Sequence, residues 1–275
     1  MRHRHPFLII LTVLILLPSF ASCAYMPADT PEENAQTDTV AEEYTGTLLF
    51  EGRRYTYTGQ TEDISADGDR LVIKRSGVYL ISGKLTEGRI SVECVGTVSL
   101  VLGGFEGSSS YGAVIERTDG GELYLSALPD TVNILRTDVG ASSAYDGSLP
   151  MGCVRSVGRL VIGGEGRLTL SAPNSNGALC SDFYLISGEL SITCSEYGIF
   201  AKNSAKAIGG SLIFTSARVG IYSQKDAYNE GRIEILKNCR VRSLCRHATF
   251  TTNGTLTVTS TDIEERLQGD SVSDI

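Results

Sequence analysis

Tryptophan is absent from this 275-residue chain, histidine is scarce, and basic residues are outnumbered by acidic ones. The 24 Lys and Arg against 32 Asp and Glu give a net charge of −8, which argues against general nucleic-acid binding because that needs a basic surface. No Cys-x-x-Cys motif occurs and only three His are present, so a zinc site is not expected. G-x-S-x-G, P-loop and H-E-x-x-H motifs are missing as well.

A long apolar repeat of helical period is also lacking, so helices cannot provide the crossovers of an α/β sheet. What the chain has instead is a regular series of glycines with the pattern Gly-x-apolar-x-apolar. Successive members are 22, 22, 21 and 23 residues apart, at Gly166, Gly188, Gly210, Gly231 and Gly254. A second series keeps nearly the same spacing, at Gly177, Gly198 and Gly220.

Apolar and polar residues alternate after each glycine of the first series, as at Leu168 and Leu170, which is typical of a half-buried strand. Short strands, frequent turns and a fixed repeat length predict an all-β solenoid of about 22 residues per coil. We expect one continuous inward file of apolar side chains, formed by Leu168, Leu190, Leu212, Ile233 and Leu256. A two-sheet sandwich is the alternative, but it would not explain the constant repeat.

The N-terminus has the features of an export signal: basic residues 2–5, an apolar run from Phe7 to Leu17, and Cys23 after two small residues. This arrangement is similar to a bacterial lipobox, so residues 1–23 are predicted to be a lipoprotein signal peptide with Cys23 as the lipidated residue. Plain secretion and an uncleaved membrane anchor are the alternatives. We therefore expect the protein at the extracellular face of a bacterial cell membrane, which it contacts only through the lipid.

The remaining chain divides into three parts by composition. Residues 24–44 are acidic and poor in large apolar residues, which predicts a disordered tether. Residues 45–265 form the solenoid domain, with a turn-rich protruding loop over 138–150, and residues 266–275 form a C-terminal tail. Apart from Cys23, six Cys remain; disulfides are possible in an exported protein, but we expect most of these residues to be small buried hydrophobes.

Residues 48–260 resemble the carbohydrate-binding β-helix family of clostridial cell surfaces, the cellulose- and pectate-binding type. The resemblance rests on the opening segment Leu48–Gly52, on Gly77-Val-Tyr-Leu-Ile-Ser-Gly-Lys-Leu85, and on Gly198-Ile-Phe-Ala-Lys202. It implies a single-stranded right-handed parallel β-helix of the pectate-lyase type that binds polysaccharide. It also implies calcium held by Asp side chains before the coil glycines. Here those positions are Asn176, Tyr197 and Val219, so no cofactor is expected at that row.

The candidate carbohydrate-binding residues fall into two groups. Aromatic and amide side chains recur at one-coil spacing around the second glycine series, together with a lysine, at Asn176, Tyr197, Phe200, Lys202 and Tyr222. The alternative is that one or more of these rings points into the core. A basic segment over 237–247 contains Arg240 and Arg242, which could pair with uronates or could be an ordinary charged exterior.

Catalysis would need a base and a group that neutralises the substrate carboxylate in a lyase, or two facing acids in a glycosidase. Lys202, Lys206, Lys225 and Asp226 could supply a base, whereas the acids of the late coils are scattered. The sequence therefore predicts a monomeric surface lipoprotein that binds a plant-type glucan or a uronate-containing glycan without cleaving it. A divergent polysaccharide lyase and an adhesive scaffold without a glycan ligand are the alternatives.

Overall fold

The computed structural model describes residues 43–140 and 151–267. In these residues the protein is all-β, as expected, with 21 strands in one mostly parallel sheet and a single 3-10 turn as its helical element. No helix in the described residues has the length and hydrophobicity to cross a bilayer. The predicted signal peptide, nearly all of the tether, the predicted loop from residue 141 on, and the tail from residue 268 on lie outside the described residues.

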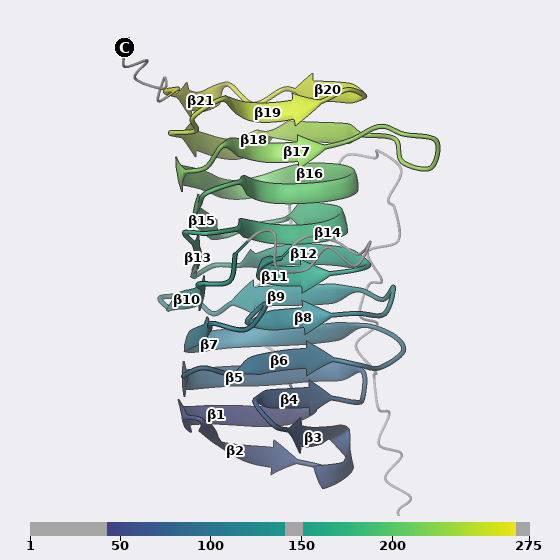
Figure 1. Ribbon diagram of the computed structural model, residues 1–275, viewed down its shortest axis with the longest axis vertical. Helices are drawn as coiled ribbons and strands as arrows, with labels where there is room; N and C mark the ends of the chain where they lie inside the picture. Colours follow the sequence, from purple (N-terminus) through teal and green to yellow (C-terminus); the bar gives the residue numbers. More distant parts are fainter. Residues whose placement is uncertain (1–42, 141–150, 268–275) are drawn as a thin grey trace, which may run out of the picture. The chain divides into compact units, whose positions relative to one another are not determined.

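The strands form three parallel ladders, and the chain passes once through each ladder before it returns to the first (Figure 1). Each such passage is called a coil below. Long strands bend at corners and so contribute to more than one ladder. The first ladder contains β5 (Gly77–Leu85), β7 (Val98–Ser109), β9 (Leu123–Ala127), β12 (Arg159–Gly164), β14 (Asn176–Leu185), β16 (Tyr197–Ser216), β18 (Arg232–Ser243) and β20 (Thr255–Val258).

The second and third ladders share several of these long strands. The second contains β1 (Gly46–Gly52), β5, β7, β10 (Val132–Thr137), β13 (Arg167–Ala172), β15 (Glu189–Cys194), β16, β18 and β21 (Asp262–Glu265). The third contains β4 (Arg70–Ile73), β6 (Arg89–Val92), β8 (Ile115–Arg117), β11 (Gly152–Ser156), β14, β16, β17 (Val219–Ser223) and β19 (Ala248–Thr252).

The first coil is closed by antiparallel strands. β2 (Arg54–Gly59) pairs antiparallel with β1, and β3 (Ile64–Asp67), which follows the 3-10 turn η1 (Thr61–Asp63), pairs antiparallel with β4. Tyr55 and Tyr57 of β2 pack against the apolar core. These elements meet the need of a stack of coils for a cap on its apolar end.

One inward file is only partly as predicted. Leu168, Leu190 and Leu212 are aligned in the second ladder and are at most 1% exposed. Their file continues with Val241 and Ile263. Ile233 and Leu256 instead belong to the first ladder, so the prediction of a single file through all five residues was wrong.

The length of an insertion explains this error. Leu190 and Leu212 are aligned and 22 residues apart, whereas the aligned pair Leu212 and Val241 is 29 residues apart. Six of the seven additional residues lie in the connection between β17 and β18, which projects from the stack in Figure 1. Because the insertion is about as long as one side of a coil, Gly231 falls 21 residues after Gly210 but at a different corner.

Glycine is required at the corner between the first and second ladders. Gly164, Gly188 and Gly210 have φ values of +92°, +76° and +85°, which L side chains rarely adopt. A Cβ at Gly188 would also lie 2.8 Å from the carbonyl oxygen of Gly164. The corner is therefore free of side chains in consecutive coils.

The interior is apolar and continuous, and it contains free thiols. Leu100, Leu135 and Leu185 are fully buried, as are most inward side chains of all three ladders. The six cysteines of the described residues are unpaired and five of them are buried, which confirms that most act as small hydrophobes.

Candidate functional site

The outer side of the third ladder carries an aromatic cluster, formed by Tyr197, Phe200 and Tyr222. Phe200 of β16 is aligned with Tyr222 of β17, and both face away from the core because their neighbours Ile199 and Ile221 point inward. The sequence left open whether these rings enter the core. All three are half-buried on the outside, so none of them does.

The three rings are in mutual contact. The ring centroids of Tyr197 and Tyr222 are 4.7 Å apart, those of Phe200 and Tyr222 5.3 Å, and those of Tyr197 and Phe200 5.6 Å. Their planes are tilted by 32° to 63°, so the rings cover one another only in part. Burial and the neighbouring Tyr197 raise the pKa of Tyr222 above its ordinary value. The cluster is thus an apolar patch edged by phenol groups.

Arg218 completes this patch, and sequence reasoning missed it. Its Nη2 donates to the Tyr197 hydroxyl oxygen at 2.6 Å, and its guanidinium carbon lies 4.9 Å from the centre of the same ring. Its Nε is 3.1 Å from Glu196 Oε2. Arg218 is 21 residues after Tyr197, so the coil period was the signal that could have located it.

Lys202 directly follows the third-ladder part of β16, two residues after Phe200, and its side chain is exposed. On the next coil the Tyr222 hydroxyl donates to Gln224 Oε1 at 3.1 Å. Lys202 is close enough to Asp226 to contribute to the lowered pKa of that carboxyl, whose main cause is the backbone N–H of Tyr228. The patch therefore has charged and hydrogen-bonding groups at its edge.

Asn176 is a structural residue and does not belong to this surface. It is 2% exposed, and its Nδ2 donates to the Met151 carbonyl oxygen at 2.7 Å. Its Oδ1 accepts a hydrogen bond from the Tyr197 backbone N–H at 3.0 Å. Both polar atoms of the Asn176 amide are therefore used in hydrogen bonds between neighbouring coils, and neither is left to bind a sugar hydroxyl.

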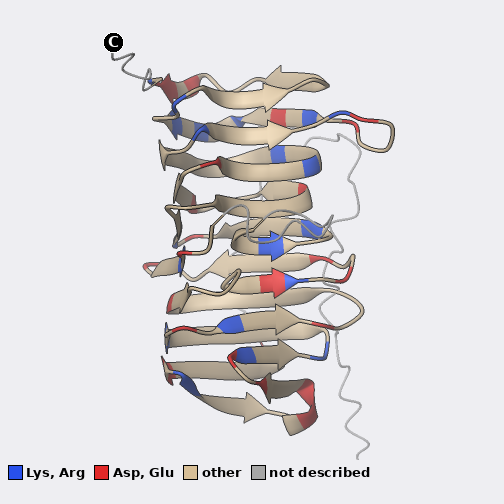
Figure 2. Ribbon diagram, viewed as in Figure 1, with Lys and Arg blue, Asp and Glu red and all other residues tan. Residues whose placement is uncertain are grey.

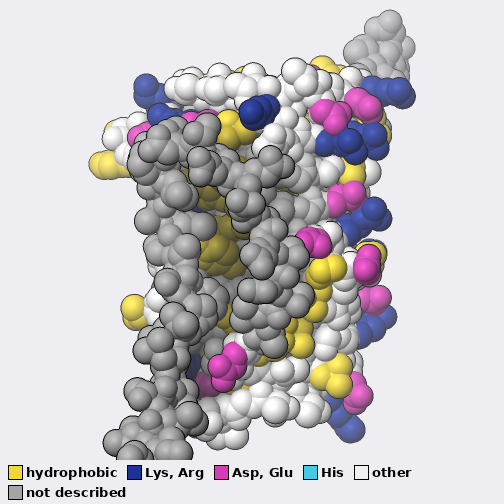
Figure 3. Space-filling view, turned by 180° about the vertical axis from the view of Figure 1, so that it is seen from behind, with side chains coloured by type: hydrophobic (Ala, Val, Ile, Leu, Met, Phe, Trp, Pro, Cys, Tyr) yellow, Lys and Arg dark blue, Asp and Glu magenta, His cyan; other side chains and the backbone are white. Residues whose placement is uncertain are grey.

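Arg240 and Arg242 lie on a different ladder from the aromatic cluster. They point outward from the second-ladder part of β18 and pair with Asp262 at 2.7 Å and Glu264 at 3.4 Å on the next coil. Acidic and basic side chains alternate in the same way along one edge of the molecule (Figure 3). The two predicted groups of binding residues are therefore not brought together, and these arginines are already paired.

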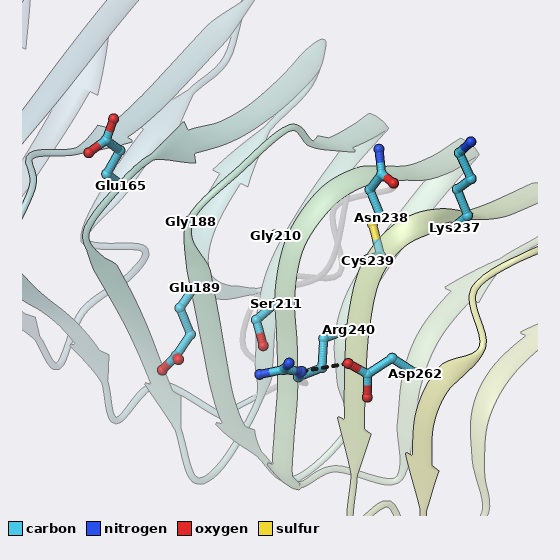
Figure 4. A pocket seen from close by; sticks show the side chains of 10 residues that line it. All are labelled: Glu165, Gly188, Glu189, Gly210, Ser211, Lys237, Asn238, Cys239, Arg240 and Asp262. Carbon is cyan, nitrogen blue, oxygen red and sulfur yellow. Dashed lines mark hydrogen bonds and ion pairs between the residues drawn. The ribbon is translucent and has the colours of Figure 1, made fainter.

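A groove runs along the glycine corner beside Arg240 (Figure 4). It has a volume of about 390 Å³, with Gly188 and Gly210 in its floor. Its remaining lining is polar except for one cysteine: Glu165, Glu189, Ser211, Lys237, Asn238, Cys239, Arg240 and Asp262. Such a groove offers hydrogen bonds to a ligand but no aromatic platform.

The row before the coil glycines does not fit calcium. Asn176 Oδ1 is engaged by a backbone N–H, Tyr197 contributes a ring, and Val219 is apolar. Among residues 43–140 and 151–267, no group of three or more His, Cys, Asp and Glu is placed to hold a metal ion. Of the lysines considered as a base, Lys206 is paired with Glu234 at 3.1 Å.

Stacked, mostly parallel strands place the described residues in the class of all-β proteins. A solved structure described as the polysaccharide lyase-like protein from C. thermocellum, gadolinium derivative, matches with a TM-score of 0.67 and 18% sequence identity. The match covers 81% of this chain and 100% of the other. At this identity it shows the fold alone.

The family follows from the sequence match. The family model described as "Carbohydrate-binding domain-containing protein" matches residues 67–273, and the chain belongs to this family. The predicted resemblance to a carbohydrate-binding family is thereby confirmed. No curated protein matches the chain.

Proposed function

We propose that the protein binds polysaccharide without cleaving it and that the aromatic cluster makes the main contact. The observation that carries this proposal is the outward position of three contacting rings on neighbouring strands of a carbohydrate-binding family member. Sugar rings have apolar C–H faces that pack on aromatic side chains, while their hydroxyls bond to phenol groups and cations. Tyr197 and Tyr222 offer both kinds of contact.

The ligand class is a plant-type glucan or a uronate-containing glycan. Strands in a ladder are about 4.8 Å apart, so a polymer lying along the stack would meet Phe200 and Tyr222 in succession. Lys202 at the edge of the cluster would pair with a uronate carboxylate, whereas Arg218 is already paired with Glu196. A neutral glucan would use the rings and phenol groups alone.

The fold that we propose is a single-stranded right-handed parallel β-helix, a solenoid of the pectate-lyase type. Three parallel ladders that the chain visits in turn, at about 22 residues per coil, support this arrangement. A connection between parallel strands of one sheet is right-handed in about 98% of cases, which gives the hand. Neighbouring coils then form a continuous outer surface for an extended ligand.

We also propose that the protein is an exported monomer, held by a lipid on Cys23 at the extracellular face of a bacterial membrane. Support comes from the basic and apolar segments that precede Cys23. Metabolic labelling with a radioactive fatty acid should label the wild-type protein and not the Cys23→Ala variant. Equal labelling of both would remove the anchor from the proposal.

A lyase is the second candidate, because the matching solved structure is described as polysaccharide lyase-like. Against it stands the lack of a carboxylate cluster for a metal in the described residues. Incubation with polygalacturonate should therefore give no unsaturated product absorbing in the ultraviolet. Accumulation of that product, lost in Lys202→Ala, would establish the lyase instead.

Binding is tested with a glycan panel and two tyrosine variants. Tyr222→Ala should raise the Kd about fivefold to tenfold, because an aromatic contact is worth about 1 kcal/mol. Tyr184→Ala is the matched control, since Tyr184 is also half-buried on the outside but lies in the first ladder beside Arg159. If the wild type bound no glycan and still attached to cells, the scaffold alternative would hold.

A further inference from the structure

An inserted arm stands beside the aromatic cluster. The arm comprises residues 224–230, between β17 and β18, and it accounts for six of the seven residues by which this coil exceeds the one before it. Figure 1 shows this connection projecting beyond the stacked strands. A loop that breaks an otherwise regular coil length needs a reason outside the packing of the coils.

The base of the arm is fixed to the neighbouring coils. Lys225 and Glu230 form an antiparallel bridge across it. Asn253 of the following coil accepts a hydrogen bond from the Lys225 backbone N–H at 2.5 Å and donates to the Lys225 carbonyl oxygen at 3.0 Å. On the preceding coil, Asn203 Oδ1 accepts from the Glu230 backbone N–H at 3.1 Å. The arm is therefore held from both sides.

The tip of the arm is organised by Asp226. Its Oδ1 accepts hydrogen bonds from the backbone N–H groups of Tyr228 at 2.7 Å and Asn229 at 2.9 Å. Its Oδ2 accepts from Asn229 Nδ2 at 2.8 Å. These bonds lower the pKa of Asp226, so the tip keeps this form at neutral pH.

This ordered tip holds Tyr228 in solvent. The residue is 95% exposed, and the structure gives its side chain no hydrogen bond or ring contact with any described residue. An aromatic ring on a loop fixed from both sides loses little conformational entropy when a ligand stacks on it. The arm starts at the cluster, because it begins two residues after Tyr222 and Gln224 at its start accepts the Tyr222 hydroxyl bond.

We propose that Tyr228 is a further sugar-stacking residue and that the arm forms a raised side wall of the glycan-binding surface. This inference rests on the proposed function. It adds to the three rings of the cluster a fourth ring, on the arm, that contacts the same glycan. A glycan chain that lies across Phe200 and Tyr222 is then held from the side by the Tyr228 ring. The arm restricts the surface to chains that fit between wall and cluster.

The absence of tryptophan from the chain gives a direct test. Tyr228→Trp introduces a sole indole at the tip, and titration with cello-oligosaccharides and oligogalacturonates should shift its emission to shorter wavelength. Tyr228→Ala should raise the Kd about fivefold without changing the thermal midpoint, because the side chain is 95% exposed. Tyr111→Trp and Tyr111→Ala are the controls, since Tyr111 is 66% exposed in another connection, and they should show neither effect.

A third variant tests whether the arm must be ordered. Asp226→Ala keeps the Tyr228 ring but removes the hydrogen bonds that order the tip. The increase in log Kd should be about half of the increase caused by Tyr228→Ala. If Tyr228→Ala binds as wild type while Tyr222→Ala is weakened, the arm is not part of the surface and the proposed function stands. If the wild type binds none of these glycans, both proposals fail.

Discussion

Two of the buried cysteines show how strongly single residues are affected by the closed interior. Cys153 and Cys194 lie inside the stack, and burial raises the pKa of each thiol to about 12. A thiolate there would lose its hydration without gaining a counterion, so the neutral form is retained. These side chains act as small apolar groups that fill space between coils.

We expect these thiols to be unreactive in the native protein. At pH 8 iodoacetamide should modify neither Cys153 nor Cys194 in the folded state, whereas both should react at once in denaturant; mass spectrometry of peptides measures this. Cys94, which is only half-buried, is the internal comparison. Rapid native labelling of Cys153 would show that the coils open easily.

The same shifts predict a loss of stability in alkali. Because the folded pKa is raised, the contribution of each thiol to stability is complete below the unfolded pKa of about 9 and is lost as pH rises toward 12. Over this range the free energy of unfolding should fall by up to about 1.4 kcal/mol per pH unit for each thiol. The urea concentration at the unfolding midpoint should fall with it. A Cys153→Ala, Cys194→Ala double variant should show a smaller fall.

At the scale of elements, the corners decide which sequences can form the coils. Gly188 has a positive φ, and a Cβ there would also meet the carbonyl of the preceding coil. Gly198 has no such φ, yet its Cβ would lie 2.6 Å from the Gly220 carbonyl oxygen. Gly188 is therefore required both by its φ and by the close approach of the neighbouring coil, and Gly198 by the close approach alone.

Gly188→Ala should destabilise the protein by more than Gly104→Ala. Gly104 has nearly the same φ, +75° against +76°, but no atom lies within 4 Å of the Cβ that it would gain. The control thus isolates the backbone term of about 1 to 2 kcal/mol, to which Gly188→Ala adds the clash. Denaturant unfolding measures both, and equal losses would mean that the corner can relax.

The sequence predicted the repeat and the strands because both depend on local alternation and on glycine. It misplaced Ile233 and Leu256, since only the pairing of distant strands shows that residues 224–230 are an insertion rather than part of a regular coil. For a related reason, Asn176 was predicted to bind a ligand and Arg218 was missed. Whether a polar side chain binds a ligand or a neighbouring coil depends on contacts one coil away.

At the scale of the whole molecule, many charged side chains are paired with one another, and the pairs of the second ladder lie away from the aromatic cluster. Charges of both signs are spread over the described strands (Figure 2), and many of them are paired between coils, as in Lys84 with Glu106 and Arg240 with Asp262. The aromatic cluster lies on a different ladder. Binding of a neutral glucan should therefore depend little on these ion pairs.

Salt separates the two ligand classes. Raising ionic strength from about 0.1 M to about 1 M shortens the Debye length from about 10 Å to about 3 Å, so contacts between uronates and Lys202 should weaken. The Kd for a neutral glucan should stay within about twofold. Glucan binding that falls as steeply as uronate binding would place the contact on charged groups instead of the rings.

The central claim is that the outer rings of the third ladder bind polysaccharide, and a glycan array with the wild type and Tyr222→Ala tests it most directly. Run with and without a calcium chelator, the array should show binding of at least one polysaccharide by the wild type, unaffected by the chelator and strongly reduced in the variant. Equal binding by both proteins, or loss of all binding in the chelator, would contradict the claim.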